Sequence, residues 1–208
     1  MADQERTFFK VDNLEIRDDT KKSSNNIGTL CGYAALFNSY SERFYGDVYE
    51  QIVPGAFTDC LNSSDCRALF NHDPNLVLGR EQAKTLRLRE DSHGLYMEVD
   101  LPDTIYANDL QKLVKRGDIS QQSFGFTIES DKWEKDEQNK RTVRSIEKIK
   151  RLYDVSPVTY PAYPETDVLA RMHEAYEKRN KKSQINKSAI IRFLETKYKY
   201  HHARGLFK

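Results

Sequence analysis

Around Ser123 the chain alternates between two kinds of residue. Successive side chains of an extended strand point to opposite faces. Here the large apolar set is Phe124, Phe126 and Ile128, and the small or polar set is Ser123, Gly125 and Thr127. The face of Ser123 therefore carries little bulk around one hydroxyl. A nucleophilic serine needs such access, but a tightly packed structural strand shows the same pattern.

A serine nucleophile needs a general base within hydrogen-bond reach and an acid that orients this base. Four of the five histidines lie in a basic tail, on an expected helix or in a hairpin turn: His201, His202, His173 and His93. His72 differs, because it ends an apolar run and is followed by Asp73 and Pro74. His72 is therefore the candidate base. From the pattern alone, a polar histidine capped by a turn is the more common explanation.

Two carboxylates are candidates for the orienting acid. Asp73 adjoins His72, but adjacent strand residues face opposite sides, so it is poorly placed. Asp154 lies on a separate, otherwise apolar segment, where a carboxylate is costly unless it is paired. The alternative for Asp154 is a carboxylate that faces solvent or pairs with Lys148 or Lys150.

The alternation at the end of this segment predicts that Leu152, Asp154 and Ser156 share one face. Ser156 is a weaker alternative nucleophile. It stands directly before Pro157, and a turn residue is the simpler interpretation of it.

The elements that must position these residues are mostly strands. Strand patterns are expected at 14–17, 27–37, 48–53, 66–72, 86–89, 95–101, 123–133 and 142–156. The pair at 86–89 and 95–101 predicts a β-hairpin, whereas 76–80 is expected to be a short connection. Helices are expected at 54–61, at 103–116 with Gly117 as the stop, and at 168–176. The sum predicts a β-rich α+β fold.

Composition limits the class of protein. The chain has 208 residues, a formal net charge of +1 and 31% charged residues, which fits one substantial domain with polar extensions. No apolar run approaches the roughly 20 residues of a membrane helix, and the first residues lack the apolar segment of a secretory signal. The cysteines are Cys31, Cys60 and Cys66, without a CxxC pair. We expect free, packed thiols in a reducing compartment, and no metal or cofactor.

Three regions are expected along the chain: an N-terminal arm at 1–26, the main domain at 27–177 and a basic tail at 178–208. The last 38 residues, Arg171 to Lys208, hold 11 Lys or Arg against 3 Asp or Glu, a formal charge of +8. The tail is either a solvated terminus or a docking and self-cleavage extension. A nucleic-acid role is weak, because no recognisable nucleic-acid module is present.

Three segments in order resemble the prohead, or capsid maturation, protease family of tailed phages. They are 70–73 with 78–80, the run 117–126 that ends in Ser-Phe-Gly-Phe, and 152–157 leading to Tyr160–Ala162. Pro54–Phe57 and Asp91–Leu95 also fit, so the resemblance extends from about Gly28 to Leu169. Each motif is weak alone, but the ordered set is specific.

This resemblance implies a barrel-like core flanked by helices, as in herpesvirus assemblins. It implies a serine endopeptidase in which His72 is the base, Ser123 the nucleophile and Asp154 the third member. Many relatives have Glu at the third position, and either carboxylate can accept from a ring N–H. The implied substrates are scaffold and major capsid protein, and commonly the enzyme itself, inside the procapsid assembling in the host cytoplasm. Assemblin-like enzymes also suggest a homodimer.

Two other functions compete with this one. A non-catalytic assembly or scaffolding protein would keep the fold without turnover. A nucleic-acid-binding protein would show a salt-dependent DNA affinity that is lost when residues 179–208 are deleted. A metal hydrolase is disfavoured, because the chain has no HExxH motif or His/Cys cluster.

Overall fold

The structure is a computed structural model that describes residues 5–8, 14–17, 26–41 and 47–159. All of these belong to the first of two compact units, Met1–Pro164. The expected helix at 168–176 and the basic tail at 178–208 lie outside the described residues. The division of the chain at residues 26 and 177 stays a prediction.

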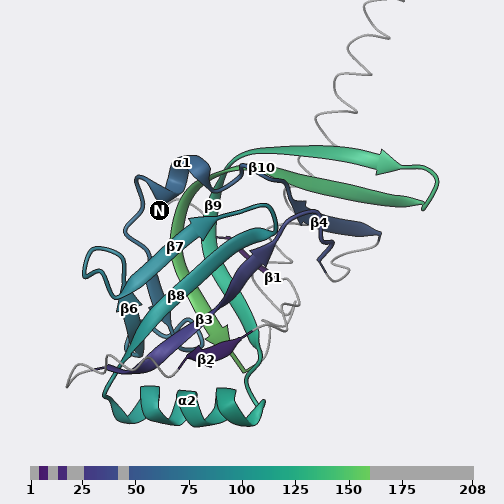
Figure 1. Cartoon of the computed structure of the whole chain (residues 1–208). Helices are drawn as coiled ribbons and strands as arrows, with labels where there is room; N and C mark the ends of the chain where they lie inside the picture. The colour runs from purple at the N-terminus through teal and green to yellow at the C-terminus, as the bar shows by residue number, and fades with distance from the viewer. Residues whose placement is uncertain (1–4, 9–13, 18–25, 42–46, 160–208) are drawn as a thin grey trace, which may run out of the picture. The chain divides into compact units, whose positions relative to one another are not determined.

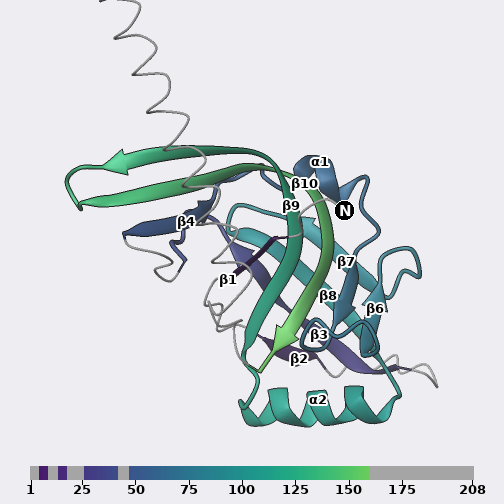
Figure 2. The ribbon, with the colours of Figure 1, turned by 180° about the vertical axis from the view of Figure 1, so that it is seen from behind.

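The larger of two sheets has the strand order β1-β9-β10-β5-β6, and β4 pairs in addition with β10 (Figure 1). Its members are β1 (Glu5–Phe8), β4 (Val48–Ile52), β5 (Arg67–Leu69), β6 (Val77–Arg80), β9 (Gln121–Asp136) and β10 (Arg141–Val158). Most neighbours are antiparallel, but β10 runs parallel to both β4 and β5. The central strands β9 and β10 continue past the body of the sheets as a long ribbon beside β4 (Figures 1 and 2).

The smaller sheet has the order β2-β3-β8-β7. Its members are β2 (Glu15–Arg17), β3 (Asn26–Leu36), β7 (Leu86–Glu90) and β8 (Gly94–Pro102). The expected hairpin is β7–β8, and this prediction is confirmed. Neither sheet closes on itself through the pairings of the described strands, so the β-rich α+β class is confirmed but a barrel is not.

Within the described residues, two helices accompany these sheets: α1 (Thr58–Leu61) and α2 (Ile105–Arg116), which lies across one end of the sheets (Figure 1). The expected helix is confirmed, and its residues Ala107, Leu110 and Val114 are buried at helical spacing. Gly117 ends the helix in the left-handed region at φ +87°, a conformation that glycine adopts without steric cost.

One apolar core joins both sheets and α2. Large members that are almost fully buried come from β3, β8, β9 and β10: Leu30, Met97, Phe124, Phe126 and Leu152. The rings of Phe124 and Phe126 stack with centroids 4.9 Å apart. Such aromatic pairs contribute about 0.5–1.5 kcal/mol beyond the burial of their area. The core therefore fixes β9 with its aromatic face inward.

Two sequence expectations near β5 are wrong. The strand expected at 66–72 is only β5, because the chain turns immediately after Leu69. The connection expected at 76–80 contains β6, which pairs antiparallel with β5 and forms the sheet edge. The sequence pattern did not predict this strand because glycine is uncommon within strands. A Cβ added at Gly79 would lie 2.5 Å from a Val99 methyl group, so the close packing requires glycine.

Candidate active site

Ser123 lies on the face of β9 opposite the aromatic core. Phe124 pairs across strands with Val155, and both are fully buried in the core. Ser123 pairs with Ser156, and Gly125 with Asp154, on the other face. The predicted alternation around Ser123 is therefore confirmed. It brings the candidate nucleophile and the candidate acid onto one face of two adjacent strands.

A β-bulge in β10 decides where the Asp154 side chain points. The register shifts between Leu152 and Asp154, so that Leu152 pairs with Phe126 on the core face while Asp154 pairs with Gly125 on the other. The expectation that Leu152, Asp154 and Ser156 share a face is wrong for Leu152. A bulge adds one residue to a strand and so reverses the alternation beyond it. This reversal allows a carboxylate to follow an apolar run without entering the core.

His72 lies in a tight turn beyond the end of β5, not on the strand. Asn71 and His72 both have positive φ, +54° and +59°, a left-handed conformation that is uncommon for residues other than glycine. Backbone hydrogen bonds close the turn, from Phe70 to Leu76 at 3.0 Å and from Asp73 to Phe70 at 3.0 Å. Left-handed residues of this kind cluster at functional sites.

The His72 turn is attached to the end of β10 through Asn71. The Asn71 backbone N–H donates to the Pro157 carbonyl at 3.0 Å. Its side chain accepts from the Thr159 backbone N–H at 2.8 Å and donates to the Thr159 hydroxyl at 3.2 Å. The strand that carries Asp154 therefore also holds the turn that carries His72.

His72 and Asp154 meet directly although 82 positions separate them in the sequence. The distance from His72 Nδ1 to Asp154 Oδ1 is 2.5 Å, and the two side chains are only 6% and 5% exposed. Neighbouring Asp73 instead accepts hydrogen bonds at Oδ1 from the amide and side chain of Asn75. Asp154 thus occupies the position from which a carboxylate fixes the tautomer of the ring, leaving Nε2 to act as a base.

Two polar atoms of this cluster have no hydrogen-bond partner among the described residues: His72 Nε2 and Ser123 Oγ. Both are buried, and Ser123 is 0% exposed. Unsatisfied buried polar groups are rare and need a specific reason. These two atoms would be the nucleophile and the base of a catalytic site. Their missing hydrogen bond fits such a site, because catalytic hydrogen bonds are often long in the absence of substrate and form only when it binds.

Ser156 is a buried part of the same cluster. Its hydroxyl donates to Asp154 Oδ1 at 2.6 Å, and the residue is 0% exposed. The expectation of a turn residue is wrong, because Ser156 lies within β10. The alternative partners of Asp154 are not used either: Lys148 binds Asp59 at 3.1 Å, and Lys150 lies on the exposed part of the strand.

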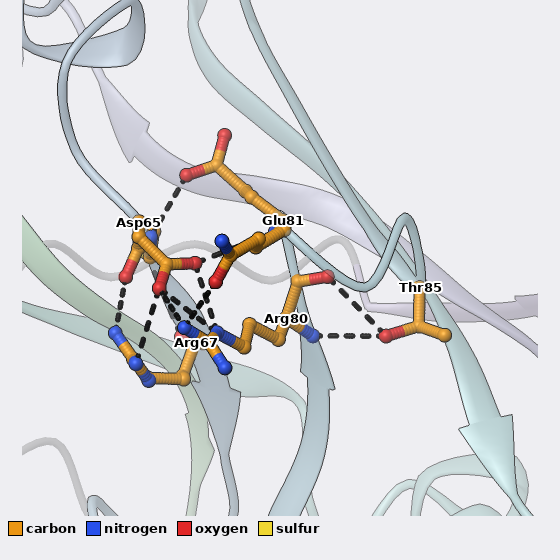
Figure 3. A network of polar contacts seen from close by, with 7 residues as sticks. Asp65, Arg67, Arg80, Glu81 and Thr85 are labelled. Atoms are coloured by element: carbon orange, nitrogen blue, oxygen red, sulfur yellow. Dashed lines mark hydrogen bonds and ion pairs between the residues drawn. The ribbon is translucent and has the colours of Figure 1, made fainter.

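A half-buried ion-pair network lies beside the cluster at the β5–β6 edge (Figure 3). Asp65 accepts hydrogen bonds from Arg80 Nε at 3.0 and 2.9 Å and pairs with Arg67 at 3.2 Å. The hydrogen bonds from Arg80 lower the pKa of Asp65. Arg67 is the cross-strand neighbour of Asp154. The network therefore anchors the strand next to the candidate acid.

The cysteines are free and buried, as expected. Burial raises the pKa of the Cys60 thiol to about 12 and that of Cys66 well above its ordinary value. Neither thiol is ionised near neutral pH, so neither is suited to act as a nucleophile. The part of the chain that the structure describes shows no cluster of three His, Cys, Asp or Glu that would hold a metal ion. Its helices are too short or too polar to cross a membrane.

The sequence thus identified three residues that the structure places in one cluster, His72 and Asp154 in contact and Ser123 on the adjacent strand. The sequence placed Ser156 on the face of Asp154 but did not reveal its hydrogen bond to this carboxylate, and it missed the supporting contacts of Asn71. Asn71 gave a weaker signal as an Asn able to adopt positive φ before the histidine.

Comparison with known proteins gives one result. The model of a family described as caudovirus prohead serine protease matches residues 12–180. Among curated proteins and among solved structures, none matches the chain.

Proposed function

The chain belongs to the caudovirus prohead serine protease family, whose model covers residues 12–180 of its 208, and from this premise we propose a catalytic triad of Ser123, His72 and Asp154. Family membership supports a peptidase of capsid maturation that acts in the phage procapsid. The observation that carries the residue assignment is the buried contact of 2.5 Å between His72 Nδ1 and Asp154 Oδ1. It leaves Nε2 free in the same cluster that contains the Ser123 hydroxyl.

The reaction is acyl transfer. His72 Nε2 takes the proton of Ser123 Oγ while this oxygen attacks the peptide carbonyl, and the same ring then gives the proton to the leaving amine. Water attacks the acyl-enzyme in a second round of the same proton transfers. Asp154 accepts from the ring N–H at Nδ1 and stabilises the imidazolium that forms in both rounds.

The strand pairing restricts how a substrate reaches Ser123. At this residue β9 has a neighbour on each edge, with Phe8 of β1 on one side and Ser156 of β10 on the other. A substrate peptide therefore cannot extend the sheet beside β9 at this point. It has to approach over the sheet face that carries Ser123, Gly125 and Asp154, where glycine leaves the least bulk.

The proposed substrates are the major capsid protein, the scaffold protein and the chain itself, in the assembling procapsid of the host cytoplasm. A homodimer is part of the same proposal. The implied relation to assemblins also keeps a barrel-like arrangement of the core as a proposal. No nucleic acid or membrane is required for any of these steps.

The first test is the intact mass of the purified chain, and of capsid and scaffold proteins incubated with it, for wild type and Ser123→Ala. Cleavage by wild type alone supports the proposal. A buried serine of β10, Ser145, provides the control Ser145→Ala, because its hydroxyl accepts a side-chain hydrogen bond from Gln51 at 2.9 Å and has no bond to the candidate site among the described residues. Identical cleavage by Ser123→Ala would overturn the role of Ser123.

The alternative is a non-catalytic assembly protein with the same fold. The complete burial of Ser123 is the observation in its favour. This alternative would be established if wild type and Ser123→Ala both supported procapsid assembly and wild type cleaved neither capsid nor scaffold protein in these procapsids.

A further inference from the structure

Asp154 Oδ1 is an acceptor shared by two side chains. His72 Nδ1 lies 2.5 Å from it and the Ser156 hydroxyl 2.6 Å from it. An ionised carboxylate only accepts, so Ser156 must donate. Hydrogen bonds to a charged group are shorter and stronger than those between neutral groups. The hydroxyl therefore restricts the rotation of the carboxylate while its oxygen faces the imidazole ring.

The backbone of Ser156 is restricted as well. The residue before a proline is confined to extended conformations, and Pro157 follows Ser156 directly. Ser156 is also paired with Ser123 across β9 and β10 and is completely buried. Its hydroxyl is thus fixed by the strand, by the proline and by packing. A donor held in this way positions its acceptor more strictly than a mobile one would.

Resting on the proposed triad, we propose that Ser156 is a positioning residue: it holds the Asp154 carboxylate in the orientation that receives the His72 ring. Ser156 does not touch the reacting atoms. Its contribution arises when the imidazolium forms, because a carboxylate that can rotate away stabilises this cation less well. This role replaces the earlier interpretations of Ser156 as an alternative nucleophile or a turn residue.

The test compares the reaction of an alkyl fluorophosphonate probe with wild type, Ser156→Ala, Ser156→Thr and Ser145→Ala. The probe forms a bond between Ser123 Oγ and phosphorus, fluoride leaves, and His72 takes the proton. We expect Ser156→Ala to react about tenfold more slowly, equal to about 1.4 kcal/mol of barrier. Ser156→Thr keeps the donor and should recover most of the rate. Ser145→Ala, also a buried serine of β10, should react like wild type.

A second readout separates positioning from a general loss of stability. The proton between His72 Nδ1 and Asp154 Oδ1 should give a low-field NMR resonance, assigned by its loss in Asp154→Asn. We expect Ser156→Ala to shift or broaden this resonance and Ser145→Ala to leave it unchanged, at comparable midpoints of thermal unfolding. Ser156 is fully buried, so the extra methyl group of Ser156→Thr can destabilise the fold, and the rate of this variant is compared only together with its unfolding midpoint. Ser156→Ala adds no volume and is the variant that decides between the two outcomes.

The failures are distinguishable. If the probe labels wild type and Ser156→Ala at the same rate, and both show the same low-field resonance, the role of Ser156 is overturned and the triad stays intact. A folded wild type that the probe labels no faster than Ser123→Ala overturns the proposed triad itself, and the role of Ser156 with it.

Discussion

The ribbon of β9 and β10 carries two buried charged clusters that differ in how far their polar groups are satisfied. In the projecting half, Arg144 donates to Glu50 at 2.8 Å and to Asp131 at 2.5 Å. The Trp133 ring N–H adds a bond to Asp131 at 3.1 Å. In the half next to the core, Asp154 is satisfied by two neighbours, whereas His72 Nε2 and Ser123 Oγ have none among the described residues.

This difference supports a structural role for the Arg144 cluster and the proposed catalytic role for the cluster at Ser123. Charges buried in a structural cluster must pair with each other, since an isolated buried charge costs several kcal/mol. The cluster at Ser123 has unused hydrogen-bonding capacity, and the turn beside it holds Asn71 and His72 in a left-handed conformation. Both features reduce the stability of the free protein, and such features are typically retained where a ligand uses them. Mutations in the two clusters should therefore affect different quantities.

The largest effect is expected from Asp154→Asn, which keeps the size of the side chain. The amide does not hold the His72 ring in the tautomer needed for catalysis, so kcat should fall about ten-thousandfold. The midpoint of urea unfolding should move far less than this loss implies. Peptide cleavage and urea unfolding measured on one preparation check both parts. If the free energy of unfolding of Asp154→Asn fell enough to explain the lost activity, the cluster at Ser123 would have a structural role like that of the Arg144 cluster.

The second prediction concerns Arg144→Ala. Glu50 is 0% exposed and would lose its 2.8 Å ion pair with Arg144, so the free energy of unfolding should fall by about 3–5 kcal/mol. The activity per folded molecule should stay near that of wild type, because the pair lies in the projecting half of the ribbon. Urea unfolding and active-site titration with a fluorophosphonate measure the two quantities.

The matched control is the double variant Arg144→Met with Glu50→Met, which removes both buried charges. Its stability should recover most of the loss, as apolar replacements of buried ion pairs commonly do. A double variant as unstable as Arg144→Ala would show that the side chains matter here by their shape and not by their charge.

The third prediction tests the turn that carries the base. Asn71→Ala removes both side-chain bonds to Thr159 and leaves a β-carbon at φ +54°. We expect a loss of about 1–2 kcal/mol in stability and a fall in kcat of about tenfold. Asn71→Gly is the control, because it loses the same bonds without backbone strain. Equal stability of the two variants would show that the positive φ is not costly.

The sequence predicted those parts of the fold that depend on local pattern. The hairpin of β7 and β8 and the helix α2 follow from alternation, helical spacing and the glycine stop. It did not predict β6 or the bulge before Asp154, because both are set by packing against distant strands. The pairing of Arg144 with Glu50, 94 positions apart, has no local signal either.

The candidate site shows the same limit. The residue types and the ordered motifs selected His72, Ser123 and Asp154, but the strand pattern placed His72 on a strand, and the structure shows a left-handed turn. Simple alternation also gave Leu152 the wrong face. The candidate residues could therefore be selected from the ordered motifs, whereas their geometry depends on one bulge and one turn.

The smallest effect is expected at the half-buried cluster of Asp65, Arg67 and Arg80 (Figure 3). Like the Arg144 cluster, it pairs arginine with a carboxylate, but its side chains are 33–40% exposed, so water and salt screen its charges. Hydrogen bonds from Arg80 lower the pKa of Asp65 in the folded chain, so the carboxylate stabilises the fold above its unfolded pKa, near pH 4. This contribution is lost as the pH falls through the folded value.

Asp65→Asn should therefore cost little stability at pH 7, less in high salt, and nothing once the pH is low enough to protonate Asp65 in the folded wild type. Thermal unfolding of both proteins from pH 7 to pH 2, at low and high salt, measures this difference. Arg144→Ala, compared with wild type at the same two salt concentrations, should keep its deficit in high salt, because Arg144 is 4% exposed. A salt-independent loss in Asp65→Asn as large as that of Arg144→Ala would show that exposure does not separate the two arginine clusters.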